Sequence, residues 1–336
     1  MPAPIWRSMI PLSILDLAPI AEGATAADAL HNARDLAQRA ERWGYRRFWL
    51  AEHHSMPGIA SAATSVALAY VGEGTSTIRI GAGGIMLPNH APLQIAEQFG
   101  TLESLYPGRI DLGLGRAPGT DQAAAYALRR NLNADVNQFP RDVQELMDYL
   151  KPAEPGRRVR AIPGEGLDIP IWILGSSLYG AQLAALLGLP YAFASHFAPD
   201  QLMHALQVYR ENFQPSAQLA KPYVMLGYNV FAADSDEEAT VLATSVMQAV
   251  INLRTGNPTQ LKPPAAGFYE DLPPGHRSMI DHFLACSAIG APETVRARVE
   301  AFVAETRADE LMITSQMFDH RQRLRSYEIL AGLTAG

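Results

Sequence analysis

Hydrophobic and polar positions alternate along the chain in blocks that predict strands and helices in turn. Short apolar runs such as 10–15 and 47–51 are typical of buried strands, whereas 29–43 repeats apolar residues every three or four positions, as a helix does. The predicted strands are 10–15, 47–51, 78–82, 109–114, 169–174, 191–194, 223–231 and 310–314. Helices are predicted at 29–43, 61–73, 92–105, 139–150, 178–187, 199–213, 293–306 and from 234 onward.

Because helices separate all eight predicted strands, the order of elements indicates an α/β fold. In a chain of 336 residues, eight such units favour a closed (β/α)₈ TIM barrel with insertions. An open, doubly wound sheet is the alternative. We therefore interpret 1–336 as a single domain, and we expect ligands to bind where the carboxyl ends of the strands meet.

Two stretches interrupt the alternation. The segment 157–166 is basic and rich in turn residues, and 254–277 contains five prolines and several glycines. A connection of that length without regular structure is often a lid over an active site. We expect 254–277 to form a mobile lid, and a solvated surface excursion is the alternative.

Composition and charge exclude several classes of protein. The formal net charge is −7 and no run of Lys or Arg occurs, which argues against a nucleic-acid partner. No stretch reaches the roughly 18 apolar residues of a membrane-spanning helix, so no membrane association is expected. The single cysteine, Cys286, excludes an intramolecular disulfide and fits a reducing compartment, so we expect the protein in the cytoplasm.

Candidate catalytic residues follow the second predicted strand, where an apolar run ends in Glu52, His53 and His54. Metal binding would need further ligands, and no His or Cys spacing in the sequence supplies them. We therefore predict no metal site and interpret these residues as an acid/base or hydrogen-bonding group. Histidines with a purely structural role are the alternative.

Glycines follow the third predicted strand, and an arginine follows the fourth. The segment 81–84 contains three glycines, which would let a flat ligand approach the backbone closely. The segment 113–119 has the wrong spacing for a dinucleotide fingerprint and a proline where the helix should begin. Arg116 within it is well placed to bind a phosphate, and a structural ion pair is the alternative.

The fifth predicted strand leads through Gly175, Ser176 and Ser177 directly into an apolar helix. Hydroxyls and unpaired backbone N–H groups at a helix N-terminus form a natural site for an anion such as phosphate. Plain N-capping by one of the serines is the alternative, and it is compatible with phosphate binding.

Taken together, these motifs resemble the flavin-dependent luciferase-like monooxygenases, in particular the branch that includes the bacterial luciferase subunits. The likeness extends from Ser13 to about Thr314. It rests on the order and spacing of four segments: 50–54 (Leu-Ala-Glu-His-His), 83–88 (Gly-Gly-Ile-Met-Leu-Pro), 108–116 (Gly-Arg-Ile-Asp-Leu-Gly-Leu-Gly-Arg) and 175–177 (Gly-Ser-Ser).

The resemblance implies an enzyme that binds reduced FMN (FMNH₂), supplied by a separate NAD(P)H-dependent flavin reductase. Reduced FMN would react with O₂ to give a C4a-(hydro)peroxide, which would oxidise a small organic substrate such as an aldehyde or ketone. Gly115 stands where the luciferase α subunit has a reactive cysteine, which argues against light emission. A deazaflavin (F420)-dependent hydride-transfer enzyme and a non-catalytic flavin-binding protein are the alternatives.

The resemblance also assigns roles to individual residues. His53 matches the catalytic histidine, with Glu52 and His54 beside it, and Gly83 and Gly84 match a non-proline cis peptide bond next to the flavin ring. The expected FMN-binding residues are Asp16, Gly83, Gly84, Arg116, Arg141, Gly175, Ser176, Ser177, Tyr179 and Gly180. Independently of the resemblance, Ser195 and His196 after the sixth predicted strand and Gln316 after the eighth are expected to contact substrate, because they lie at the carboxyl ends of strands. By analogy, we expect a homodimer that pairs through helices of the early units.

Overall fold

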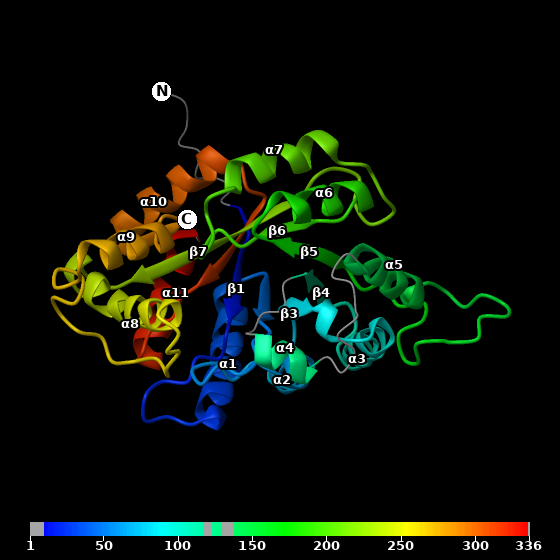
Figure 1. Cartoon of the computed structure of the whole chain (residues 1–336), viewed down its shortest axis with the longest axis horizontal. Coiled ribbons are helices and arrows are strands. Elements are labelled where there is room, and N and C mark those ends of the chain that lie inside the picture. Colours follow the sequence, from blue (N-terminus) through cyan, green and yellow to red (C-terminus); the bar gives the residue numbers. More distant parts are fainter. Residues whose placement is uncertain (1–9, 117–121, 129–137, 335–336) are drawn as a thin grey trace.

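The computed structural model describes residues 10–116, 122–128 and 138–334. Residues 117–119 of the glycine-rich segment that follows the fourth strand lie outside the described residues. Within the described part, nine parallel strands form one sheet, and eight of them close into a barrel because β6 pairs with β7 as well as with β5 (Figure 1). The strands are β1 (Leu12–Asp16), β2 (Arg47–Leu50), β3 (Arg79–Met86), β4 (Ile110–Gly115), β5 (Ile171–Gly175), β6 (Tyr191–Phe193), β7 (Val224–Ala232), β8 (Ser287–Gly290) and β9 (Glu310–Thr314).

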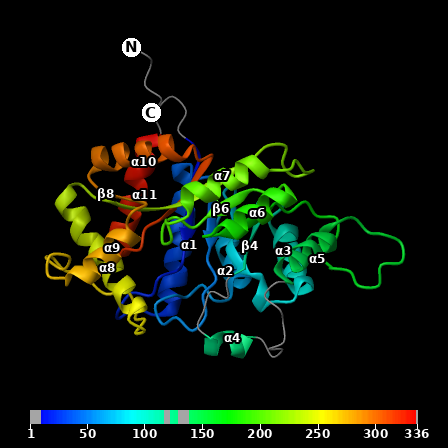
Figure 2. The same cartoon turned by 45° about the horizontal axis from the view of Figure 1, so that its top comes forward.

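Helices surround the barrel, so the (β/α)₈ architecture predicted from the sequence is confirmed (Figures 1 and 2). Neighbouring helices pack along its outside, for example α1 against α2, α3 against α5 and α6 against α7. Of the helices in the described residues, none has the length and apolarity that a bilayer span requires. The helices are α1 (Ala26–Trp43), α2 (Thr64–Glu73), η2 (Leu87–Asn89, a 3₁₀ turn), α3 (Pro92–Leu105), α4 (Gln122–Leu128), α5 (Phe139–Leu150), α6 (Leu178–Leu187), α7 (Leu202–Asn212), α8 (Asp236–Arg254), α9 (Pro274–Phe283), α10 (Pro292–Thr306) and α11 (His320–Thr334).

The eight predicted strands correspond to the eight barrel strands, and β8 is an additional strand that the sequence pattern did not reveal. β7 is nine residues long and extends beyond the barrel, so its last four residues, 229–232, pair with β8. Helix α9 was also missed, because it begins with Pro273 as N-cap and Pro274 in its first turn. Proline suits that position of a helix, although it had suggested irregular structure. The segment 254–277 therefore ends in regular structure.

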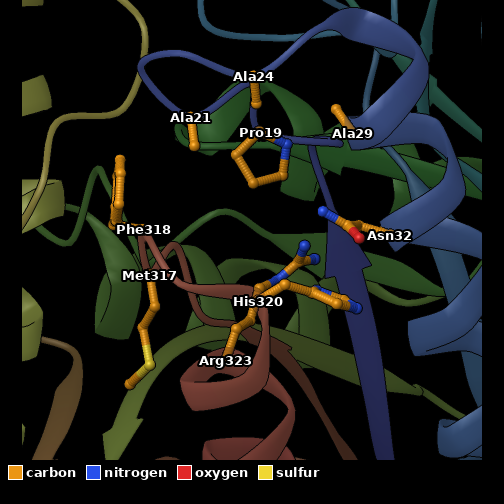
Figure 3. A pocket seen from close by; sticks show the side chains of 9 residues that line it. All are labelled: Pro19, Ala21, Ala24, Ala29, Asn32, Met317, Phe318, His320 and Arg323. Carbon is orange, nitrogen blue, oxygen red and sulfur yellow. The ribbon is translucent and has the colours of Figure 1, made fainter.

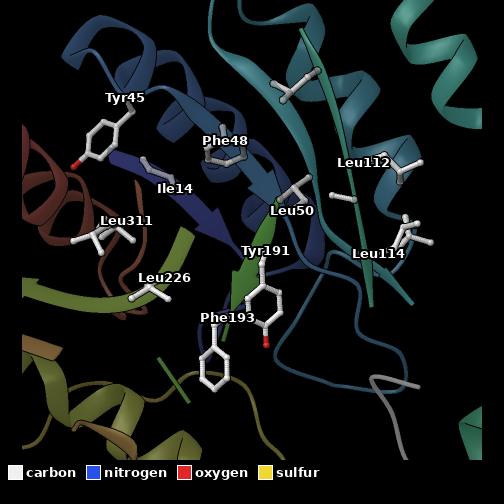
Figure 4. Close-up of a cluster of buried hydrophobic side chains, with 14 of the residues drawn as sticks. Ile14, Tyr45, Phe48, Leu50, Leu112, Leu114, Tyr191, Phe193, Leu226 and Leu311 are labelled. Carbon is white, nitrogen blue, oxygen red and sulfur yellow. The ribbon is translucent and has the colours of Figure 1, made fainter. Parts of the chain in front are cut away.

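Side chains alternate between the outside and the inside of the barrel, as the period of a strand requires, apart from a register shift in β3 between Ala82 and Ile85. Outward-facing residues such as Ile14, Phe48 and Leu311 are fully buried against the helices (Figure 4). The inward-facing residues Leu15, Trp49, Trp172, Met225 and Met312 form a separate apolar cluster in the barrel interior. This inner cluster closes the barrel below its carboxyl end and provides the floor on which the candidate site is built.

Candidate active site

A cavity of about 560 Å³ opens at the carboxyl ends of the barrel strands. Its floor includes Leu15, Trp49, Met225 and Met312 from the barrel interior. Loops that follow different strands form its walls, which is where active sites of such barrels are found. Of the residues predicted from the sequence, those that line the cavity are Glu52, His53, Gly83, Arg116, Gly175, Ser176, Ser177, Tyr179, Gly180, His196 and Gln316.

Glu52 ties the loop after β2 to the end of β3. Its Oε1 accepts hydrogen bonds from Nε2 of His54 at 2.8 Å and Nε2 of His90 at 2.9 Å, and its Oε2 accepts one from the N–H of Met86 at 2.9 Å. Burial opposes ionisation of Glu52, but the hydrogen bonds from His90, His54 and Met86 outweigh it and lower the pKa of the carboxyl. Glu52 is thus an ionised clamp that joins the His54 side chain, next to His53, to the end of β3 and to His90.

The ligand atoms of Glu52, His54 and His90 lie within 4.8 Å of one another, which is a spacing that metal sites also use. In this arrangement, however, both imidazoles direct Nε2 at the same carboxylate oxygen. A metal ion would have to displace both of these hydrogen bonds, so the geometry fits a hydrogen-bonded clamp. The sequence pattern did not single out His90, although its position just after the third strand could have indicated a residue near the site.

His53 and His196 both line the cavity, and the charge of His53 is close enough to affect His196. Burial, with a smaller contribution from His53, lowers the pKa of His196 to about 4, so its imidazole is neutral at physiological pH. The ring packs edge-on against Phe197, with centroids 4.8 Å apart. Asn229 Nδ2 donates a hydrogen bond to the His196 carbonyl at 2.6 Å, which fixes the backbone.

Gly227 leaves the space that the His196 ring occupies. A Cβ at Gly227 would lie 2.0 Å from Nδ1 of His196, so any larger residue would displace the ring. Ser195, which was predicted to contact substrate, instead donates its Oγ hydrogen bond to the Gly227 carbonyl at 2.6 Å and is not among the described residues that line the cavity. Ser195 therefore supports the position of its neighbour.

The other flank of the cavity combines a cation with a helix N-terminus. Ser177 is the N-cap of α6, yet within the described residues its side chain makes no capping hydrogen bond. The Arg116 guanidinium carbon lies 4.2 Å from the centroid of the Tyr179 ring, which itself belongs to the first turn of α6. A positive charge, two hydroxyls and the positive end of a helix dipole therefore converge on one side of the cavity.

Three further predicted residues are not among the described residues that line the cavity: His54, Gly84 and Arg141. His54 is held by Glu52, and Gly84 forms the cis peptide bond with the lining residue Gly83. Arg141 is exposed in the first turn of α5, whose first residue, Phe139, does line the cavity. Arg141 thus lies two residues from the cavity wall and is not itself among the described residues that form it.

Asp16 lies at the end of β1 and forms a buried ion pair with Arg323 of α11, with Nη2 2.6 Å from Oδ1. It also accepts a hydrogen bond from the N–H of Ala18 at 2.9 Å. Arg323 borders a separate pocket of about 20 Å³ that His320 and Asn32 also line, and that suits about one water molecule (Figure 3). Asp16 therefore anchors α11 to the barrel instead of contributing to the large cavity.

The predicted lid contributes Pro258, Thr259 and Leu261 to the cavity wall. Leu261 forms a short parallel bridge with the loop after β1, in which its N–H donates to Ile20 O at 2.9 Å and its carbonyl accepts from Glu22 N at 2.8 Å. Gly58 makes room for this contact, because a Cβ there would lie 2.5 Å from the Thr259 carbonyl. The segment therefore closes one side of the site.

Comparisons with known proteins find similarity over nearly the whole chain. The family model described as luciferase-like monooxygenase matches residues 10–310. A protein named luciferase-like monooxygenase from Escherichia coli (strain K12) is 54% identical over 320 residues, or 95% of this chain and 96% of that protein. N-acetyl-S-alkylcysteine monooxygenase from Bacillus subtilis (strain 168) is 39% identical over 237 residues, or 69% of this chain and 70% of the relative.

Solved structures show the same fold. The structure of apo-MsnO8 superimposes with a TM-score of 0.90 at 34% identity and covers 97% of this chain and 98% of its own. The oxygenating constituent of 3,6-diketocamphane monooxygenase from Pseudomonas putida, in complex with FMN, gives 0.70 at 19% identity, with 96% of each chain covered. An F420-dependent secondary alcohol dehydrogenase gives 0.69 at 14% identity, covering 97% of this chain and 99% of its own.

Proposed function

Because the chain belongs to the luciferase-like monooxygenase family and is therefore an oxidoreductase, we propose that it uses reduced FMN and O₂ to oxygenate a small organic substrate. The observation that carries the proposal is a single cavity with Arg116 and the α6 N-terminus on one flank and His53 on another. Arg116 and the α6 N-terminus are the kind of groups that bind a phosphate, and a histidine such as His53 is the kind that transfers a proton.

The residues present fit FMN in two respects. The uncapped start of α6 and the neighbouring Arg116 can receive a phosphate, and a cavity of about 560 Å³ lies within the usual range for ligand sites, about 300–1,000 Å³. Gly83, Gly175 and Gly180 line the wall between these groups and the barrel interior, where they leave the backbone open to a flat ring.

Bound reduced FMN would supply the electrons that activate O₂, so that one oxygen atom enters the substrate and the other leaves as water. The chain contributes binding, exclusion of water and proton transfer. Its floor of aliphatic and aromatic side chains keeps bulk water away from the reacting atoms. His53 is the residue that we assign to proton transfer at the reacting centre, and neutral His196 is a second imidazole in the wall of the same cavity.

Oxygen uptake by the purified protein with chemically reduced FMN tests the proposal. We expect uptake to yield an oxygenated product from a panel of aldehydes, ketones and thioethers. Thioethers join the panel because a 39% identical relative is named for N-acetyl-S-alkylcysteines. Tight binding of F420 and oxygen-independent hydride transfer to a carbonyl would instead support the deazaflavin alternative. Tight FMN binding without any turnover of the panel would favour a non-catalytic flavin-binding protein.

Replacing Arg116 with alanine should weaken FMN binding about 10-fold to 100-fold, because charge-assisted hydrogen bonds to the phosphate would be lost. Riboflavin lacks the phosphate, so its affinity should change little. Fluorescence titration of both flavins with both proteins measures the difference. Equal weakening of FMN and riboflavin would contradict a role of Arg116 in phosphate binding.

The remaining features of the proposal concern partners. A separate NAD(P)H-dependent flavin reductase would supply reduced FMN, as the name "oxygenating constituent" indicates for the Pseudomonas putida neighbour.

The single cysteine supports action in the cytoplasm. Val66 on α2 and Leu105 on α3 are 69% and 60% exposed, which supports a homodimer through these helices, and sedimentation analysis tests it. We assign the lid role to 254–277.

A further inference from the structure

One face of α8 lines the cavity from the barrel side to its mouth. The residues on this face are Val246, Ala249, Val250, Leu253 and Arg254, and their spacing is that of a single helical stripe. Exposure increases along the stripe, from 2% at Val246 and 8% at Val250 to 48% at Leu253. The stripe therefore runs outward from the buried interior and ends in an exposed arginine at the cavity mouth.

Arg254 has no acidic partner among the ion pairs of the described residues. The positions one helical turn before it, Val250 and Ile251, are apolar. In a chain with a formal net charge of −7, an arginine that faces a ligand cavity without an acidic partner leaves its charge available to a ligand. The other arginine among the described residues that line the cavity, Arg116, stacks on Tyr179 at the opposite, proposed phosphate-binding flank.

The length of the stripe indicates how long a ligand it could accommodate. From Val246 to Arg254 a helix rises about 12 Å, at about 1.5 Å per residue. Phe283 of α9 and Leu261 of the proposed lid add apolar surface to the same cavity. A flexible chain of about eight carbon atoms has a similar extended length, and an anionic group at its end would reach the guanidinium.

We propose that the substrate of this site is an anionic amphipathic molecule, with an apolar arm along α8 and a carboxylate bound by Arg254. This proposal rests on the proposed function, because it assumes that FMN occupies the flank of Arg116. Arginine binds carboxylates through paired, charge-assisted hydrogen bonds, so an uncharged analogue of the same shape should bind less well.

A basic residue in the last turn of a helix also complements the helix dipole, which is the alternative explanation of Arg254. Arg42 provides a matched control, because it is an exposed arginine in the last turn of α1 and is not among the described residues that line the cavity. A dipole effect predicts that Arg42→Gln and Arg254→Gln behave alike. A ligand-binding role predicts that only Arg254→Gln changes ligand affinity.

Isothermal titration of the FMN-loaded protein with octanoate and with octanamide tests the proposal. We expect the wild type to bind octanoate at least about tenfold more tightly than octanamide. Arg254→Gln should abolish this preference, Arg254→Lys should retain part of it, and Arg42→Gln should retain all of it. Equal binding of the two probes, no binding of octanoate, or an unchanged preference in Arg254→Gln would overturn the proposal.

The two proposals fail in different ways. FMN loading is measured first by flavin absorbance, without any substrate. If FMN does not bind, the proposed function is wrong, and titration of the flavin-free wild type and Arg254→Gln still decides whether Arg254 selects carboxylates. If FMN binds and the octanoate preference is absent, only the inference about the substrate is wrong.

Discussion

Replacing His53 with alanine is expected to lower product formation about 10²-fold to 10⁴-fold, which is the usual contribution of a general acid or base. FMN affinity should change little, because the phosphate flank with Arg116 and Ser177 lies on other loops of the cavity. His53 lies three residues after β2, between Glu52 and His54, whose side chains are hydrogen-bonded to each other. Its effect should therefore appear in turnover and not in cofactor binding.

Turnover is measured with a flavin reductase, as the ratio of product formed to NADH consumed. The matched control is His54→Ala, because His54 is the adjacent histidine but contacts Glu52 and is not among the described residues that line the cavity. We expect His54→Ala to lower stability more than the rate per folded molecule. A product-to-NADH ratio for His53→Ala equal to that of the wild type would rule out the proton-transfer role.

The pH profile distinguishes the two histidines of the cavity. His196 has a pKa of about 4 because it is buried, so it remains neutral throughout the range from pH 5 to 8. A change in rate within that range must then arise from another group. If the profile of the wild type has a midpoint between pH 5 and 8, it should disappear in His53→Ala and persist in a variant at His196.

The barrel could be predicted from the sequence because its strands and helices obey simple periods. The outward-facing residues Ile14, Phe48 and Leu311 pack on helices and leave a strong apolar signal in β1, β2 and β9. β8 was missed because its sequence, Ser-Ala-Ile-Gly, has a single large apolar residue, and it pairs with the extension of β7 alone. A short edge strand with so few apolar residues does not produce the apolar run that revealed the barrel strands.

The site was partly predictable for a similar reason. Polar residues at the carboxyl ends of strands converge by topology, so Glu52, His53, Arg116 and Ser177 could be expected in one cavity. What the sequence could not give is the direction of each side chain. Asp16 occupies the same edge, yet its carboxylate turns to Arg323 of α11, more than 300 residues away in the chain. Only tertiary contacts decide such cases.

Arg254 is the converse case, a residue that lines the cavity but that the sequence did not indicate as part of the site. It lies at the start of a proline-rich segment, where it was read as the beginning of a loop, and it is in fact the last residue of α8. Its stripe partners Val246 and Val250 had no special signal, because an apolar helix face is normally buried against the core. The face is recognisable as a ligand surface only once the cavity is seen.

Replacing Arg47 with methionine should lower the free energy of unfolding by about 3–5 kcal/mol, because it removes the buried cation that two buried carboxylates share and leaves them only the more exposed Arg79 and Arg46. Arg47 Nη1 lies 2.6 Å from Asp111 Oδ2, and its Nε lies 3.0 Å from Glu310 Oε1. The side chains of Asp111 and Glu310 are fully buried inside the barrel, below the apolar floor of the cavity. Urea denaturation measures the loss.

The control is Arg160→Met. Arg160 pairs with Glu165, but the Arg160 side chain is 52% exposed, so its loss should cost less than about 1 kcal/mol. If Arg47→Met were no more destabilising than Arg160→Met, the buried pairs would contribute nothing beyond a surface ion pair.

The double variant Arg47→Met/Glu310→Met separates attraction within the pair from the cost of an unpaired charge. Removing both groups leaves no uncompensated Glu310, and Asp111 still has Arg79, whose Nη2 lies 2.7 Å from Oδ1. The double variant should therefore be more stable than Arg47→Met alone, although it has lost more polar contacts. If the losses were instead additive, the destabilisation of Arg47→Met would come from lost packing, such as its contact with the Trp172 ring, 4.8 Å from the guanidinium carbon.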